Sequence, residues 1–134
     1  MASGIALTNA GVAILTNRIT QAGTAPKNIG WGTGTTTPAV TDTALQTEAA
    51  PTTSGGRTVG TESRTTTTVT NDTYTVTGTV TQNQAGPVAI TEAGLFDNVT
   101  GGNNLIHGVF AAINTSLNDA IAFTFNLKIA ANLV

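Results

Sequence analysis

Two segments of the chain alternate strictly between apolar and small polar side chains, and this pattern constrains the fold more than any other feature. Residues 74–81 place Tyr, Val and Gly on one side and Thr on the other, and residues 121–129 repeat the pattern with Ile, Phe and Leu. A period of two is typical of a β-strand with one buried face. We expect the Thr face to meet solvent or a partner, and the segment 121–129, the longest and most regular, to lie centrally in the core.

Turn signals separate these segments from further short strands. Asn71 and Asp72 form a good turn pair inside a hairpin predicted over residues 57–82, and Asn118 and Asp119 precede the last strand. Shorter strands are predicted around Ile29, over 88–96 with a bulge near Ala93 and Gly94, and over 105–110. Six to eight strands with turns between them favour one mainly-β domain over residues 1–134, an antiparallel β-sandwich or jelly roll.

One N-terminal helix and one long irregular excursion complete the predicted organisation. The helix is expected around residues 8–21, with Thr8 or Asn9 as its cap and an apolar stripe of Val12, Leu15 and Ile19. Residues 35–56 are rich in Thr, Ala, Pro and Gly. This composition favours a surface excursion with one helical turn near residues 42–45, and an arm that orders only on assembly.

The low charge of the chain is its most informative bulk property. Only 9% of the residues are charged, against about 25% in an ordinary soluble domain. Hydroxyl groups lose less than carboxylates when they leave water, so we interpret this surface as one meant to be covered by neighbouring subunits, rather than that of a soluble monomer. The alternative of an unusual monomer remains open.

Several classes of function are disfavoured by the same counts. The chain has no Cys, no apolar run long enough to cross a bilayer and no basic signal region, so we expect synthesis in the cytoplasm and no membrane partner. Its basic residues form no cluster, which argues against nucleic acid. They are Arg18, Lys27, Arg57, Arg64 and Lys128.

No residue pattern predicts catalysis, a cofactor or a metal site. The one histidine, His107, has no neighbouring nucleophile motif, and we expect it at a sheet surface or interface. Most carboxylates lie in predicted turns, and Glu92 and Asp97 are the only close pair near regular structure. A calcium site near Asp97 is the one metal alternative, although nothing matches an EF-hand. The Gly-Trp-Gly-Thr-Gly segment at 30–34 lacks the Lys of a phosphate loop; its glycines indicate a close backbone approach or positive φ.

Several segments together resemble a known group of proteins. They are residues 28–36, 42–48, 71–76 and 90–97, followed by a Gly-Gly turn and a Phe-rich final strand. In this order they resemble small structural proteins encoded by tailed bacteriophages, over about residues 8–130. The resemblance implies a virion component without catalytic residues. It implies either a capsid decoration (cement) protein, bound to the major capsid protein and guessed to be a trimer, or a tail, baseplate, fibre or collar component.

The capsid position is favoured because the chain is short and has no coiled coil or repetitive shaft. Segment 90–97 also resembles the attachment domains of tail fibres, which supports the tail alternative. A carbohydrate-binding adhesion module and a small hydrolase are the alternatives from other classes. Few large side chains are available as anchors, and most are expected in the core, with Trp31 the best interface candidate. These anchors are Trp31, Tyr74, Phe96, Phe110, Phe123 and Phe125.

Overall fold

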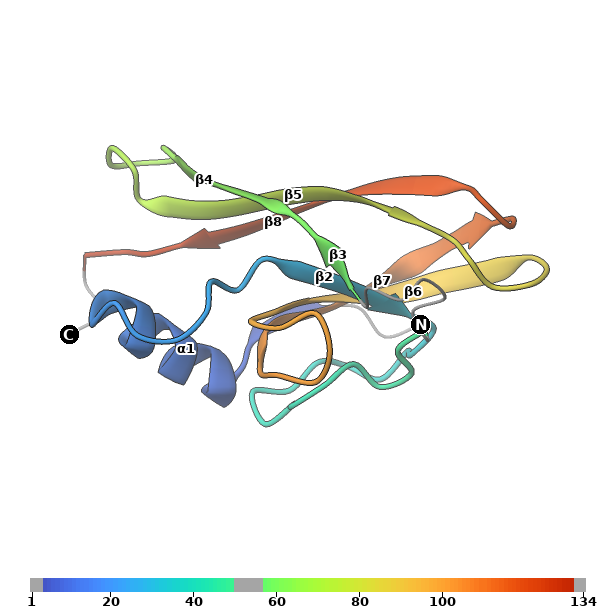
Figure 1. The fold of residues 1–134 in the computed structure, drawn as a ribbon, viewed down its shortest axis with the longest axis horizontal. Helices are drawn as coiled ribbons and strands as arrows, with labels where there is room; N and C mark the ends of the chain where they lie inside the picture. The colour runs from blue at the N-terminus through green and yellow to red at the C-terminus, as the bar shows by residue number, and fades with distance from the viewer. Residues whose placement is uncertain (1–3, 50–56, 132–134) are drawn as a thin grey trace.

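Two antiparallel sheets and one helix make up the computed structural model, which describes residues 4–49 and 57–131 (Figure 1). The predicted β-sandwich with a single short N-terminal helix is confirmed. The larger sheet has the strand order β1 (Gly4–Leu7), β7 (Asn104–Thr115), β6 (Val88–Phe96), β2 (Asn28–Gly32) and β3 (Thr58–Val59). The smaller sheet has the order β4 (Thr61–Thr65), β5 (Thr73–Thr81) and β8 (Ala120–Lys128).

The core lies between the two sheets and follows the period-two pattern. In β5, Val76 and Val80 are buried, whereas Thr77 and Thr79, which lie between them in sequence, are exposed. The valines pack in one apolar cluster with Ile29, Leu95 and other aliphatic side chains of the larger sheet. The alternation therefore marks the buried face correctly over residues 76–81, whereas Thr75, on the side expected to be exposed, is buried and bonded to Thr65 and Asn126.

The predicted hairpin is formed by β4 and β5, paired from Thr61 opposite Thr77 to Thr65 opposite Thr73. Asp72 organises the connection: its carboxylate accepts hydrogen bonds from the backbone N–H groups of Val69, Thr67 and Thr68. These bonds, above all the one from Val69, hold the pKa of Asp72 well below its ordinary value.

Two strand predictions were wrong in detail. Segment 121–129 is not central: β8 is an edge strand of the smaller sheet, and β7 is longer. Alternation reports that one face of a strand is buried, which is equally true at the edge of a sheet. The irregularities of β6 lie between Ile90 and Glu92 and between Leu95 and Phe96, not at Ala93 and Gly94, which pair regularly with β7.

Helix α1 (Asn9–Ile19) is capped by Thr8, as predicted, but of its predicted apolar stripe only Leu15 packs against the core. Gly11 and Ile14 are buried, whereas Val12 is 52% and Ile19 83% exposed. The helix lies so close to β7 that a Cβ on Gly11 would be 2.6 Å from the carbonyl oxygen of Leu105. The smallest residue of the helix therefore sets its buried face.

Replacing Thr8 should weaken the helix start. Its hydroxyl is fully buried, accepts from the N–H of Gly11 (2.9 Å) and donates to the carbonyl of Asn104. We expect Thr8→Ala to lower the free energy of unfolding in urea by about 2 kcal/mol. Thr16→Ala, on the exposed side of the helix, is the matched control and should stay within about 0.5 kcal/mol. Equal losses in both variants would contradict the role of the cap.

Candidate functional site

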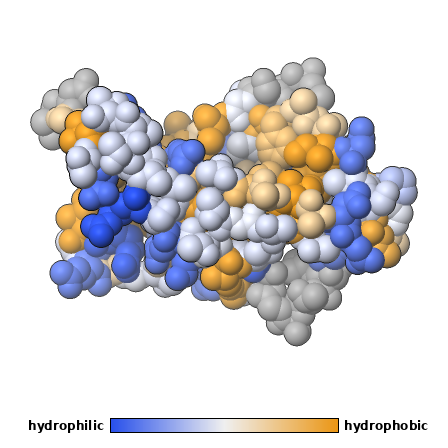
Figure 2. Space-filling view, turned by 90° about the horizontal axis from the view of Figure 1, so that it is seen from above, coloured by the Kyte–Doolittle hydropathy of each residue, from blue (hydrophilic) through white to orange (hydrophobic). Residues whose placement is uncertain are grey.

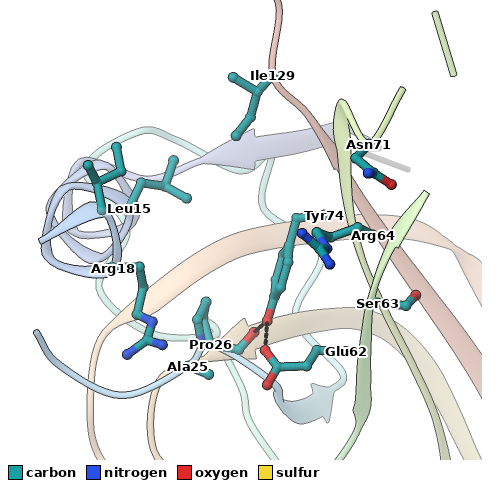
Figure 3. Close-up of a pocket in the computed structure, with 11 residues that line it drawn as sticks. Leu15, Arg18, Ala25, Pro26, Glu62, Ser63, Arg64, Asn71, Tyr74 and Ile129 are labelled. Atoms are coloured by element: carbon teal, nitrogen blue, oxygen red, sulfur yellow. Dashed lines mark hydrogen bonds between the residues drawn. The ribbon is translucent and has the colours of Figure 1, made fainter. Parts of the chain in front are cut away.

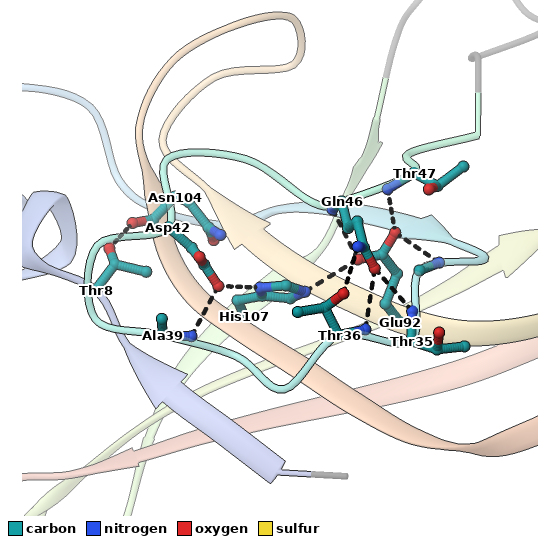
Figure 4. Close-up of polar contacts among 11 residues, drawn as sticks. Thr8, Thr35, Thr36, Ala39, Asp42, Gln46, Thr47, Glu92, Asn104 and His107 are labelled. Carbon is teal, nitrogen blue, oxygen red and sulfur yellow. Dashed lines mark hydrogen bonds and ion pairs between the residues drawn. The ribbon is translucent and has the colours of Figure 1, made fainter. Parts of the chain in front are cut away.

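A buried carboxylate, Glu92 of β6, holds the excursion that follows β2 (Figure 4). Its Oε1 accepts from the backbone N–H groups of Gly34 (3.0 Å) and Thr47 (2.7 Å), and its Oε2 from that of Gln46 (2.9 Å). His107 Nε2 lies 3.0 Å from the same Oε2. Glu92 is fully buried. Its four partners fill the acceptor capacity of a carboxyl group, and these hydrogen bonds offset the cost of removing it from water.

His107, on the neighbouring strand β7, links Glu92 to a second carboxylate. Its Nδ1 lies 2.7 Å from Asp42 Oδ2. The side chain is 3% exposed, so the expectation that it lies at a surface or interface was wrong. Each ring nitrogen therefore has a carboxylate oxygen within hydrogen-bond distance. Both ring nitrogens are thereby engaged inside the protein.

Asp42 is the outer member of this cluster. Burial pushes its pKa upward, but the hydrogen bond from the N–H of Ala39 and the contacts with His107 outweigh burial and hold the pKa below its ordinary value. The carboxylate therefore stays ionised well into the acid range. This keeps the far end of the excursion attached to β7.

The described part of the excursion, residues 33–49, is thus ordered in the single chain. Gln46 adds to it by accepting from the N–H groups of Thr35 (2.9 Å) and Thr36 (3.0 Å). The helical turn expected near residues 42–45 is absent from this described part. Residues 50–56, the rest of the predicted arm, lie outside the described residues.

The glycines of segment 30–34 make room for this attachment. A Cβ on Gly32 would lie 2.2 Å from the carbonyl oxygen of Thr47, and one on Gly34 would lie 2.7 Å from Glu92 Cδ. Neither glycine has a positive φ. Of the two structural reasons expected from the sequence, close approach is therefore the one that applies.

A second ion pair fixes the end of the excursion. Arg57 Nε and Nη2 donate to the two oxygens of Glu48 at 2.6 and 2.9 Å, a bidentate arrangement. The guanidinium also lies 3.4 Å from the centre of the Phe96 ring, a cation–π contact. Arg57 Nη1 donates to the carbonyls of Asn98 and Gly101 in the turn after β6. The motifs at 30–34, 42–48 and 90–97 therefore meet in one place.

We refer to Glu92, His107, Asp42, Glu48 and Arg57 as the polar clamp. The sequence had paired Glu92 with Asp97, but Asp97 accepts instead from Asn103, through its backbone N–H (2.7 Å) and its amide (3.1 Å). Within the described ranges, no three His, Asp or Glu side chains are arranged to hold a metal ion. What the clamp does in the structure is attach the excursion to the larger sheet through hydrogen bonds and ion pairs.

Of the anchor residues predicted from the sequence, five are buried or half-buried in the sandwich, and one lines a surface groove. Trp31, Phe96 and Phe125 are buried, and Phe110 and Phe123 are half-buried with ring centres 5.9 Å apart. Tyr74 lines a groove of about 930 Å³ between α1 and the smaller sheet (Figure 3). Its hydroxyl lies within donating distance of the carbonyl oxygen of Pro26 (3.2 Å) and of Glu62 Oε2 (3.1 Å), and its one hydrogen can bond to either. Burial and the charge of Glu62 raise its pKa.

The outer face of the smaller sheet carries almost no charge. The strand register brings Thr61 opposite Thr77, Thr77 opposite Thr124, and Thr79 opposite Ala122. Figure 2, which looks onto this side of the molecule, shows a surface of intermediate hydropathy, drawn pale, across its middle. We refer to the exposed small residues on this side as the threonine face. They are Thr61, Ser63, Thr65, Thr77, Thr79, Thr81, Ala120, Ala122, Thr124 and Asn126, and the charged residue Lys128 lies beside them at the end of β8.

Comparison of the chain with protein-family models, with curated proteins and with solved structures gave no match. Within residues 4–49 and 57–131, the single helix is too short to cross a membrane. The polar clamp and the threonine face are therefore the features on which a function must be argued.

Removing the charge at the centre of the clamp should cost substantial stability. Glu92→Gln replaces one acceptor oxygen by an amide that must face N–H donors, and we expect the free energy of unfolding in urea to fall by about 3 kcal/mol. Glu62→Gln, which alters an exposed pair with Lys27, should change it by less than about 1 kcal/mol. Similar small changes in both would contradict the central role of Glu92.

The lowered pKa values of Asp42 and Asp72 predict acid sensitivity. A carboxyl group with a lowered folded-state pKa contributes stability that is fully present above the unfolded value, about 3.9, and is lost as pH falls toward the folded value. The free energy of unfolding should therefore be flat from pH 7 to about 5 and decline below about 4. Asp42→Asn should be less stable at pH 7 and decline less steeply; parallel curves for the two proteins would refute this contribution.

Proposed function

We propose that this chain is a non-enzymatic structural subunit of a tailed-bacteriophage virion, and that it decorates the capsid by binding across the major capsid protein. The observation that carries the proposal is the threonine face, a sheet surface of exposed small side chains without a carboxylate. The order of the sequence motifs, which resembles that of phage structural proteins, gives the proposal its biological setting.

The physical argument concerns the cost of covering this surface. The centres of protein interfaces are depleted in charged residues, because a buried unpaired charge is expensive whereas a hydroxyl is easily paired with a backbone group. Three strands supply hydroxyls, small methyl groups and one amide here. A modest affinity per copy becomes strong attachment when many copies bind one lattice.

The polar clamp supports the same function by making the subunit rigid. Excursion residues 33–49 are bound to the larger sheet before any partner arrives, by backbone hydrogen bonds to Glu92 and by the contact of Asp42 with His107. Binding therefore does not have to order that segment, and less of the contact energy is offset by lost conformational freedom.

An adhesion function has weaker support. Its best site is the groove beside Tyr74, where Arg18, Arg64 and Glu62 surround an apolar floor. Tyr74 is the only aromatic side chain among the lining residues, and its hydroxyl already has two partners inside the chain. Saturable binding of the isolated protein to a glycan array would favour this alternative.

The copy number in purified particles decides between the capsid and the tail. We expect mass spectrometry of purified particles of a phage whose genome encodes this chain to give peptide intensities close to those of the major capsid protein. A few copies per particle would move the protein to the tail, baseplate or collar. Absence from the particles would overturn the virion proposal as a whole.

A charge placed in the threonine face tests the surface itself. Thr77 lies on the middle strand of the sheet and is exposed. We expect Thr77→Lys to reduce the occupancy of the particle at least about tenfold at limiting protein, because a buried unpaired ammonium costs more than 1.4 kcal/mol. Thr16→Lys, on the exposed side of α1, is the matched control and should bind normally. Equal occupancy of both variants would exclude the threonine face as the contact.

A further inference from the structure

The free edge of β8 differs from the other sheet edges of the molecule. Among the described strands, β3 and β1 at the edges of the larger sheet have two and four residues, and β4 at the other edge of the smaller sheet has five, including Glu62 and Arg64. Short length and charge are the usual protections of an edge against pairing with another chain. β8 has nine residues, no Pro and one charge, Lys128, at its end.

The backbone groups at this edge can be identified from the ladder with β5. Ile129 N–H donates to the carbonyl of Asp72 (2.8 Å) and Gln82 N–H donates to that of Asp119 (2.8 Å), so the odd-numbered residues of β8 face β5. The N–H and C=O groups of the even-numbered residues therefore point away from the sheet. These residues are Ala120, Ala122, Thr124, Asn126 and Lys128, and all five are exposed.

The apolar side of the same strand is also incompletely covered. Ile121, Phe123 and Leu127 are half-buried, in contrast to Phe125, which is 7% exposed. Phe123 contacts the rings of both Phe110 and Phe125, with centre separations of 5.9 and 6.2 Å. A strand added at this edge would therefore gain main-chain hydrogen bonds and a row of apolar side chains at once.

We propose that the occupant of this edge is a second copy of the same chain, which pairs its β8 antiparallel to the first around a twofold axis at Thr124. The sequence of β8 is self-complementary in this register. On the threonine face, Ala122 lies opposite Asn126 of the second copy and Ala120 opposite Lys128 of the second copy, so no like charges meet. On the apolar side, Phe123 lies opposite Phe125 and Ile121 opposite Leu127.

The paired sheet would have six strands in the order β4-β5-β8-β8-β5-β4, with one continuous threonine face. A twofold contact of this kind uses the same patch on both subunits, which is the commonest symmetry of homo-oligomers. It favours a dimer as the building unit over the trimer expected from the phage resemblance. The contact requires only this chain, so the dimer proposal can be tested independently of the virion proposal.

Sedimentation velocity of the purified full chain over a range of concentrations tests the proposal. We expect a species of twice the 13.5 kDa chain mass that increases with concentration. Thr124→Pro removes the N–H at the twofold axis; because this N–H points away from β5, the internal ladder is kept. The variant should associate at least about tenfold more weakly. Thr124→Val, which keeps the N–H and the side-chain shape, is the matched control and should dimerise normally.

Thr124→Lys provides a second variant that keeps the backbone intact. It places two like charges opposite each other at the axis, where they are destabilising, and the exposed position should tolerate the side chain in the monomer. We expect it to be monomeric with an unchanged circular dichroism spectrum. A wild-type chain that stays monomeric at about 100 μM, or a dimer that withstands both the Pro and the Lys variant, would overturn the proposal.

Hydrogen exchange locates the contact. In the dimer, the amides of Ala122, Thr124 and Asn126 should become protected as concentration rises, whereas those of Phe123 and Phe125, already bonded to β5, should change little. Protection confined to another surface would show a different dimer and reject this edge as the interface.

Discussion

The structure depends on one carboxyl group that is completely buried. Glu92 reaches into the sandwich, and its burial is tolerated because three backbone N–H groups and His107 surround it. Gly32 and Gly34 are required by the same interaction, since a side chain at either position would occupy the space that the carboxylate and the Thr47 carbonyl use. One residue therefore explains both the conformation of the excursion and the composition of the segment that precedes it.

The two sheets use polar residues in opposite ways. The larger sheet encloses ionisable side chains: Glu92, His107 and the neighbouring Arg57 are nearly or fully buried, and each has a hydrogen-bond partner. The smaller sheet displays hydroxyls with little charge, and some of them pair with each other, as Thr75 does with Thr65 (2.7 Å) and with Asn126 (2.8 Å). The first arrangement fixes the shape of the subunit. The second leaves a surface that a partner can cover with a small desolvation cost.

The sequence predicted elements well wherever local pattern determines structure. The alternation in β5, the cap at Thr8 and the turn at Asn71 depend on neighbouring residues, and all were found. The position of β8 in its sheet, the buried side of α1 and the burial of His107 depend on contacts with distant segments, and these were wrong. The pairing of Glu92 with His107 had one signal in the sequence, a lone Glu and a lone His in adjacent predicted strands that pair as a hairpin.

The polar clamp also constrains the order in which the chain can fold. Glu92 binds Gly34 across 58 residues of sequence, and His107 binds Asp42 across 65. Closing such loops costs chain entropy that one or two hydrogen bonds do not offset. The antiparallel pair β6–β7, which is contiguous in sequence, presents Glu92 and His107 together. The excursion can therefore attach only after that hairpin exists, which makes it a late-forming region of the fold.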